Sequence, residues 1–131
     1  MSETNETVDL WGDIVSETVR TPLTILKEQG ALLERKTNGI LTVDINSSSS
    51  QESFKHNFYL RSATLNYTYF LLSIRHSIEI YPIYIEFDSG HTREEKLAQN
   101  EEDFTNDLRN ILQSTKTQKV ISALLSQSAG V

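Results

Sequence analysis

The sequence predicts an α+β fold: an N-terminal helical segment, a four-stranded antiparallel β-meander and a C-terminal helical segment. Apolar residues recur every three or four positions up to about residue 36, alternate with polar residues between 40 and 87, and return to the helical period after residue 92. The predicted strands follow one another too closely for helical crossovers, which favours antiparallel pairing. A chain of 131 residues is long enough for one domain with its own core.

The N-terminal third has two helical signals. Trp11, Ile14, Val15 and Val19 follow the helical period and predict a helix that begins near Val8. Thr21-Pro22 then has the pattern of an N-cap followed by proline in the first turn. The helix that it predicts runs to about Lys36 and ends before Asn38-Gly39. Its apolar stripe consists of Leu23, Leu26, Gly30 and Leu33.

Three strands are predicted from alternating polarity, over residues 40–46, 54–61 and 66–76. The serine-rich tract at 46–53 is predicted to be a loop, because it has nothing to bury. In the third strand, alternation places Phe70, Leu72 and Ile74 on the inner face. Its outer face would then carry Tyr67, Tyr69, Ser73 and Arg75.

The fourth strand is predicted within residues 78–90, where apolar positions change parity across Tyr81-Pro82. Proline is confined to edges, strand starts and bulges, so the stretch is interpreted as one strand bent by a bulge at a sheet edge. In this interpretation Ile78, Ile80, Ile83, Ile85 and Phe87 all face the core, with Tyr81 and Tyr84 outside.

The chain is predicted to return to helix at Thr92, where Thr92 and Glu95 form a capping-box pattern. Asn100 followed by three acidic residues could restart the helix, and residues 114–117 could break it before a short terminal helix. We expect a flexible N-terminus over residues 1–7, a single domain over 8–127 and a flexible C-terminus over 128–131.

Composition excludes several classes of function. The chain has no cysteine, which excludes disulfides and thiol chemistry, and its net charge is −6. An acidic chain is a poor general binder of nucleic acid. The N-terminus lacks the basic region of a secretory signal, and no apolar run is long enough to cross a bilayer, so we expect a cytoplasmic protein without a membrane partner.

No motif predicts catalysis or a cofactor. The histidines His56, His76 and His91 lack metal-ligand spacing, and His56 is expected to be a core or rim histidine. Glu86 is followed two residues later by Asp88, whereas a metal-dependent nuclease of this size would need lysine there. A metal-dependent hydrolase is therefore the third hypothesis, with no catalytic, cofactor or metal residue assigned.

The most distinctive feature is the concentration of all five tyrosines between residues 59 and 84. With nearby arginines they are the candidate partner-binding residues: Tyr59, Arg61, Tyr67, Tyr69, Arg75, Tyr81 and Tyr84. Such a sheet face could contact another protein or a second copy of the chain, because tyrosine and arginine are enriched in binding hot spots. It could instead stack single-stranded nucleic acid or a nucleotide. The tyrosines could also simply be core residues of a sheet covered on both faces.

A small, acidic, cysteine-free α+β chain is similar in character to immunity proteins, antitoxins and bacterial or phage accessory proteins, although no motif assigns it to a family. The function predicted from the sequence is therefore non-catalytic protein binding, through the tyrosine-bearing face or an edge strand.

Overall fold

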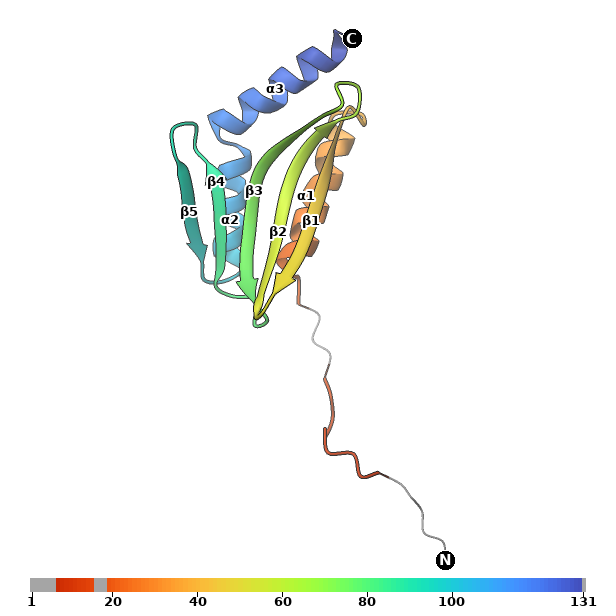
Figure 1. The fold of residues 1–131 in the computed structure, drawn as a ribbon, viewed down its shortest axis with the longest axis vertical. Helices are drawn as coiled ribbons and strands as arrows, with labels where there is room; N and C mark the ends of the chain where they lie inside the picture. Colours follow the sequence, from red (N-terminus) through yellow and green to blue (C-terminus); the bar gives the residue numbers. More distant parts are fainter. Residues whose placement is uncertain (1–6, 16–18, 131) are drawn as a thin grey trace, which may run out of the picture.

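The computed structural model describes residues 7–15 and 19–130 of the chain (Figure 1). The elements, in chain order, are α1 (Pro22–Lys36), β1 (Leu41–Ser50), β2 (Ser53–Ser62), β3 (Tyr67–Ser77), β4 (Ile83–Asp88), β5 (Arg93–Ala98), α2 (Glu101–Leu112) and α3 (Thr115–Ala129). The fold is α+β, as predicted. The strands form one antiparallel sheet in the order β1-β2-β3-β4-β5, so the predicted number of four strands is wrong.

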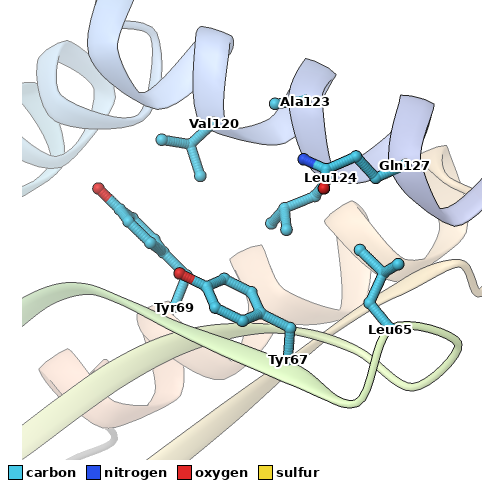
Figure 2. Close-up of a pocket in the computed structure, with 7 residues that line it drawn as sticks. All are labelled: Leu65, Tyr67, Tyr69, Val120, Ala123, Leu124 and Gln127. Carbon is cyan, nitrogen blue, oxygen red and sulfur yellow. The ribbon is translucent and has the colours of Figure 1, made fainter.

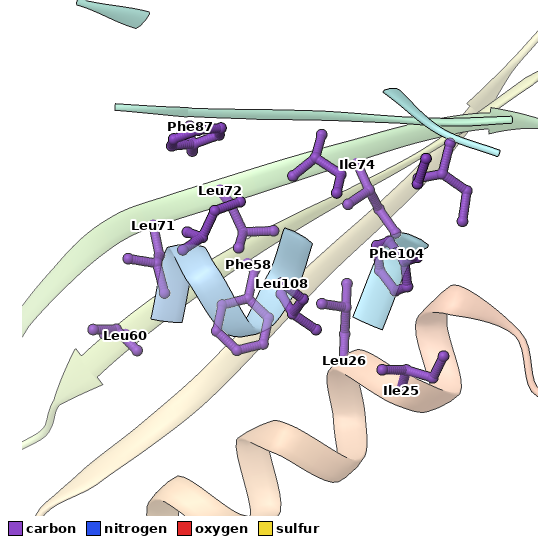
Figure 3. Close-up of a cluster of buried hydrophobic side chains, with 14 of the residues drawn as sticks. Ile25, Leu26, Phe58, Leu60, Leu71, Leu72, Ile74, Phe87, Phe104 and Leu108 are labelled. Atoms are coloured by element: carbon purple, nitrogen blue, oxygen red, sulfur yellow. The ribbon is translucent and has the colours of Figure 1, made fainter. Parts of the chain in front are cut away.

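All three helices lie on the same side of the sheet (Figure 1). α1 lies behind β1 and β2, α2 lies behind β3 and β4, and α3 crosses one end of the sheet. The core fills the space between these two layers (Figure 3). Its completely buried apolar side chains include Leu26, Leu41, Leu72, Ile74, Ile83, Ile85 and Phe104. Each helix that the structure describes is too short and too polar to span a membrane.

The helix predicted from Thr21-Pro22 is confirmed as α1. The Thr21 side chain accepts a hydrogen bond from the Thr24 backbone N–H at 3.2 Å, and Pro22 occupies the first turn. The helix predicted to begin at Val8 is wrong, because residues 7–15 are not helical and their side chains are exposed. A short helix needs a packing surface, and this segment packs against no described part of the domain. Residues 16–18 lie outside the described ranges.

The serine-rich tract at 46–53 is mostly strand, which corrects the prediction of a loop. β1 continues to Ser50, a two-residue turn follows at 51–52, and Ser53 begins β2 opposite Ser50. Pairing with the apolar strand β2 overrides the weak strand propensity of the serines, because backbone hydrogen bonds do not depend on the side chain. The other two alternating segments are confirmed as β2 and β3, with boundaries within a residue or two.

A β-bulge in β3 changes which side chains share a face. Phe58 of β2 pairs with Leu72, but the next residue, Tyr59, pairs with Phe70, which leaves Leu71 as the extra residue. Both Leu71 and Leu72 are buried as a result. Before the bulge, Tyr67 and Tyr69 lie on the helix side of the sheet and Phe70 lies on the opposite side. The predicted inner and outer faces of β3 are therefore reversed for these three residues.

Residues 78–90 form a turn and a strand rather than one bent strand. β3 ends at Ser77 and β4 begins at Ile83, and the connection contains a cis Tyr81-Pro82 peptide bond. Ile78 does not face the core, since 74% of its surface is exposed. β4 is also an interior strand between β3 and β5, so the prediction of an edge strand is wrong.

The segment predicted to begin a helix at Thr92 is the edge strand β5, which pairs with β4 along its whole length. The helix restart at Asn100 is confirmed: the Asn100 side chain accepts from the Asp103 N–H at 2.8 Å, with three acidic residues in the first turn of α2. The predicted break lies at Gln113 and Ser114. α3 is longer than the short terminal helix that the sequence predicts, and it runs to Ala129.

Candidate functional site

The side of the sheet opposite the helices is not covered by any described element, and we call it the open face (Figure 1). Strand pairing places on it the residues Thr42, Asp44, Asn57, Tyr59, Arg61, Thr68, Phe70, Ser73, Arg75, Tyr84, Glu86, Arg93, Glu95 and Leu97, among others. Aromatic rings occupy its centre on three neighbouring strands: Tyr59 on β2, Phe70 on β3 and Tyr84 on β4.

Two arginine guanidinium groups stack over the aromatic rings at the centre of the open face. The guanidinium carbon of Arg75 lies 4.4 Å from the centre of the Tyr84 ring, and that of Arg93 lies 5.4 Å from the Phe70 ring. The Phe70 ring also meets the Tyr59 ring edge-on, with centroids 5.7 Å apart. Such contacts restrict the rings and the guanidinium groups before any partner arrives.

The same arginines are paired with carboxylates. Arg93 contacts Glu86 at 3.1 Å, and Arg75 contacts Glu95 at 3.6 Å. Each pair joins neighbouring parts of the open face and leaves about half of each side chain exposed, so its contribution to folding is small. The positive charge of these two arginines is therefore balanced within the open face.

The structure separates the seven candidate residues into three groups. Tyr59, Arg61, Arg75 and Tyr84 lie together on the open face, where the Arg61 guanidinium donates to the Thr68 hydroxyl at 3.2 Å. Tyr67 and Tyr69 lie on the helix side, beneath α3. Tyr81 lies in the connection between β3 and β4, so the predicted single tyrosine surface is wrong.

Tyr67 and Tyr69 line a groove between β3 and α3 that we call the α3 groove (Figure 2). Leu65, Tyr67 and Tyr69 form one side and α3 contributes the opposite side, and Figure 2 shows both tyrosine rings extending from β3 toward α3. The groove has a volume of about 520 Å³ and is lined by Leu65, Tyr67, Tyr69, Val120, Ala123, Leu124 and Gln127. Its lining is thus predominantly apolar and carries no charged side chain.

Two titratable side chains are perturbed by their surroundings. Burial raises the pKa of Tyr81, as does the nearby negative charge of Glu101, while Arg20 acts in the opposite direction. The Tyr81 hydroxyl is buried and has no hydrogen-bond partner among the described residues.

His56 is buried on the helix side, and its Nδ1 lies 2.7 Å from the Ser47 hydroxyl. Burial lowers the pKa of His56 below its usual value, and His76 and Lys27 lower it further. The His76 ring lies 5.5 Å from that of His56 and stacks on Phe54. Within the described ranges, no three histidine or acidic side chains gather in a way that could hold a metal ion.

Sequence reasoning missed Phe70, Arg93, Glu95 and Leu97 on the open face. The signal for Phe70 was the run Phe70-Leu71-Leu72, because three consecutive apolar residues do not fit a half-buried strand without a bulge. The other three belong to β5, whose charged composition suits a helix as well as a strand. Residues 93–98 show no alternation of polar and apolar side chains, so this segment carried no periodic signal for a strand.

Comparisons with known proteins give no match: no family model, no curated protein and no solved structure resembles this chain closely enough to be identified as similar.

Proposed function

We propose that this protein is a non-catalytic binding module that docks another protein on its open face. The observation that carries the proposal is the uncovered centre of the sheet, where Tyr59, Phe70 and Tyr84 are held by Arg75 and Arg93. Aromatic and arginine side chains contribute most of the energy in many protein interfaces, and restrained side chains lose little further entropy on binding.

The charge distribution favours a protein over a nucleic acid as the partner. A phosphate backbone requires several free cationic groups, but Arg75 and Arg93 already contact Glu95 and Glu86, which leaves only Lys55 and Arg61 on this face without a carboxylate contact among the described residues. Asp44 adds a further negative charge on the same face. A protein surface that carries polar and apolar groups can cover the aromatic rings while the arginines and carboxylates of the open face remain paired.

The absence of cysteine allows a clean cross-linking test. A photoreactive group attached to a single cysteine at Thr68, on the open face, should capture partner proteins from an extract of the source cells. The same group at Ala31, which is exposed on α1, is the control. The proposal requires products that form from position 68 and not from position 31. Identical products from the two positions would contradict it.

Once a partner is captured, its affinity for substituted chains tests the role of the rings. The double substitution Arg75→Ala/Tyr84→Ala should weaken binding at least about tenfold, since it removes one stacked pair from the centre of the surface. Glu34→Ala/Arg35→Ala, on exposed positions of α1, should leave binding unchanged. Tight binding of single-stranded oligonucleotides that falls steeply with salt would instead indicate the nucleic-acid alternative.

A further inference from the structure

Residues 7–15, which we call the arm, expose an unusual amount of apolar surface. Leu10 is 90% exposed and Trp11 is 83% exposed, and Val8, Ile14 and Val15 are also open to solvent. The arm runs away from the domain (Figure 1). The Asp9 carboxylate accepts a hydrogen bond from the Trp11 backbone N–H at 2.9 Å, which fixes a local turn at the tryptophan. An exposed apolar cluster of this kind is typical of a binding segment.

The α3 groove is an unfilled apolar surface on the same chain. α3 packs on the core through Leu124 and, in part, Val120, Ile121 and Leu125, and of these Val120 and Leu124 also line the groove. The two tyrosine rings in Figure 2 leave apolar surface between themselves and Val120. An aromatic side chain and one or two aliphatic side chains would find matching contacts there.

The charges of the arm and of α3 are opposite. Residues 7–15 contain Asp9 and Asp13 and no basic residue. α3 contains Lys116 and Lys119 and no acidic residue. Lys116 lies one turn before Val120, and Lys119 lies one turn before Ala123, so both flank the residues that line the groove.

The arm and the α3 groove lie at opposite ends of the sheet. The arm joins the domain at Arg20, which is paired with Glu28 and Glu101, whereas the groove lies at the other end, beside Tyr67 and Tyr69 (Figure 1). The distance along β3 from Tyr69 to Ser77 alone is about 26 Å at about 3.3 Å per residue. Trp11 is ten residues from Thr21, a span of at most about 35 Å, so it could reach its own groove only with nearly all of these residues extended along the domain, whereas the groove of a second copy imposes no such constraint.

We propose that the arm of one copy binds the α3 groove of a second copy, with Trp11 between α3 and the tyrosine rings and Asp9 and Asp13 near Lys116 and Lys119. Reciprocal exchange of two arms closes a symmetric dimer. The interface is separate from the open face, so this proposal does not depend on the proposed function.

Trp11 is the only tryptophan, so its fluorescence reports on the arm alone. As protein concentration rises from nanomolar to submillimolar, the Trp11 emission should move to shorter wavelength in parallel with dimer formation measured by sedimentation. On dilution, the emission maximum should return to the longer wavelength of a solvent-exposed tryptophan. A monomer at every concentration, or an emission that does not depend on concentration, overturns the proposal.

Two substitutions identify the two surfaces. Trp11→Ser removes the main side chain of the arm, and Ala123→Glu places bulk and negative charge in the α3 groove; each should raise the dissociation constant of the dimer at least about tenfold. The matched control is Ser122→Glu, an equal charge at an exposed α3 position that does not line the groove. A dimer that survives either Trp11→Ser or Ala123→Glu, or that is lost equally with Ser122→Glu, contradicts the proposal.

Mixing the two defective variants gives the sharpest test. The Trp11→Ser chain keeps an intact groove and the Ala123→Glu chain keeps an intact arm, so an equimolar mixture should form a heterodimer although neither variant dimerises by itself. Failure of the mixture to associate would show that the arm and the groove are not partners. The variant Arg75→Ala/Tyr84→Ala should dimerise like the unaltered chain, which separates this result from the test of the open face.

Discussion

The backbone of Gly30 on α1 lies directly against the side chain of Val43 on β1. A Cβ atom at position 30 would lie 2.9 Å from the Val43 Cβ, which is closer than such atoms approach, and 3.1 Å from its Cγ1, which is tighter than most such contacts. This contact sets how near α1 can approach the edge of the sheet.

Gly30→Ala should therefore lower the free energy of unfolding by about 1–3 kcal/mol, although alanine is the better helix former. Val43→Gly in the same chain removes all three contacting carbon atoms and makes room for the added methyl group, so the double variant should lose less than the sum of the two single variants. Urea unfolding measures all three. Glu34→Ala, at an exposed position of α1, is the control, and an equal loss in that variant would contradict the explanation.

A buried pair of hydroxyl groups attaches the end of α3 to the sheet. The hydroxyls of Ser62 and Ser128 lie 2.7 Å apart, and Ser62 also accepts from the Leu65 backbone N–H at 3.2 Å. Ser62→Ala should cost about 1–3 kcal/mol of unfolding free energy, because it removes the partner of the buried Ser128 hydroxyl and of the part-buried Leu65 N–H. Ser128→Ala should cost less, since Leu65 keeps its partner.

Ser126→Ala is the matched control for Ser128→Ala, because it makes the same change at an exposed position of the same helix. The difference in unfolding free energy between these two variants isolates the buried contact from helix propensity. Equal stabilities would show that the contact with Ser62 does not hold α3 in place.

His56 should make the protein less stable in mild acid. Its pKa is lowered in the folded state, so below about pH 6.5 the unfolded chain binds a proton that the folded chain resists. The free energy of unfolding should fall as the pH decreases through that value, and the loss ends below the folded pKa. His56→Gln should flatten this dependence between about pH 5 and 7.5, above the range where most carboxylates titrate. The control, His91→Gln in an exposed turn, should retain the slope of the unaltered chain.

Removing the Tyr81 hydroxyl should not lower the free energy of unfolding. The group is buried without a hydrogen-bond partner among the described residues, so Tyr81→Phe should leave the thermal unfolding free energy unchanged or raise it by up to about 1 kcal/mol. Tyr67→Phe, on a ring that is half exposed, should change it by less than about 0.5 kcal/mol. A clear loss of stability with Tyr81→Phe would show that the hydroxyl is bonded in solution.

The sequence was sufficient to locate a helix or strand where a local pattern in the chain agreed with the tertiary structure. The Thr21 and Asn100 caps and the alternation of β2 locate their elements because each depends on neighbours in the chain. β5 could not be predicted in this way, because its charged residues favour helix and only pairing with β4 makes it a strand. The helical period near Trp11 was equally misleading, because no described surface covers that segment.

The candidate site was predicted only in part for a related reason. Alternation gives the correct face for Tyr59, Arg75 and Tyr84, but the extra residue in β3 reverses it for Tyr67 and Tyr69. A bulge depends on how two strands fit together, and the neighbouring residues in the chain carry little information about it.

The bulge at Leu71 has a consequence for valency. By turning Tyr67 and Tyr69 to one side of the sheet and Phe70 to the other, one inserted residue gives β3 a part in two surfaces that do not overlap. A dimer joined through the α3 grooves would leave both open faces free. Such a dimer is bivalent, and it could hold two copies of a partner together or bind a partner with repeated sites far more tightly than one chain alone.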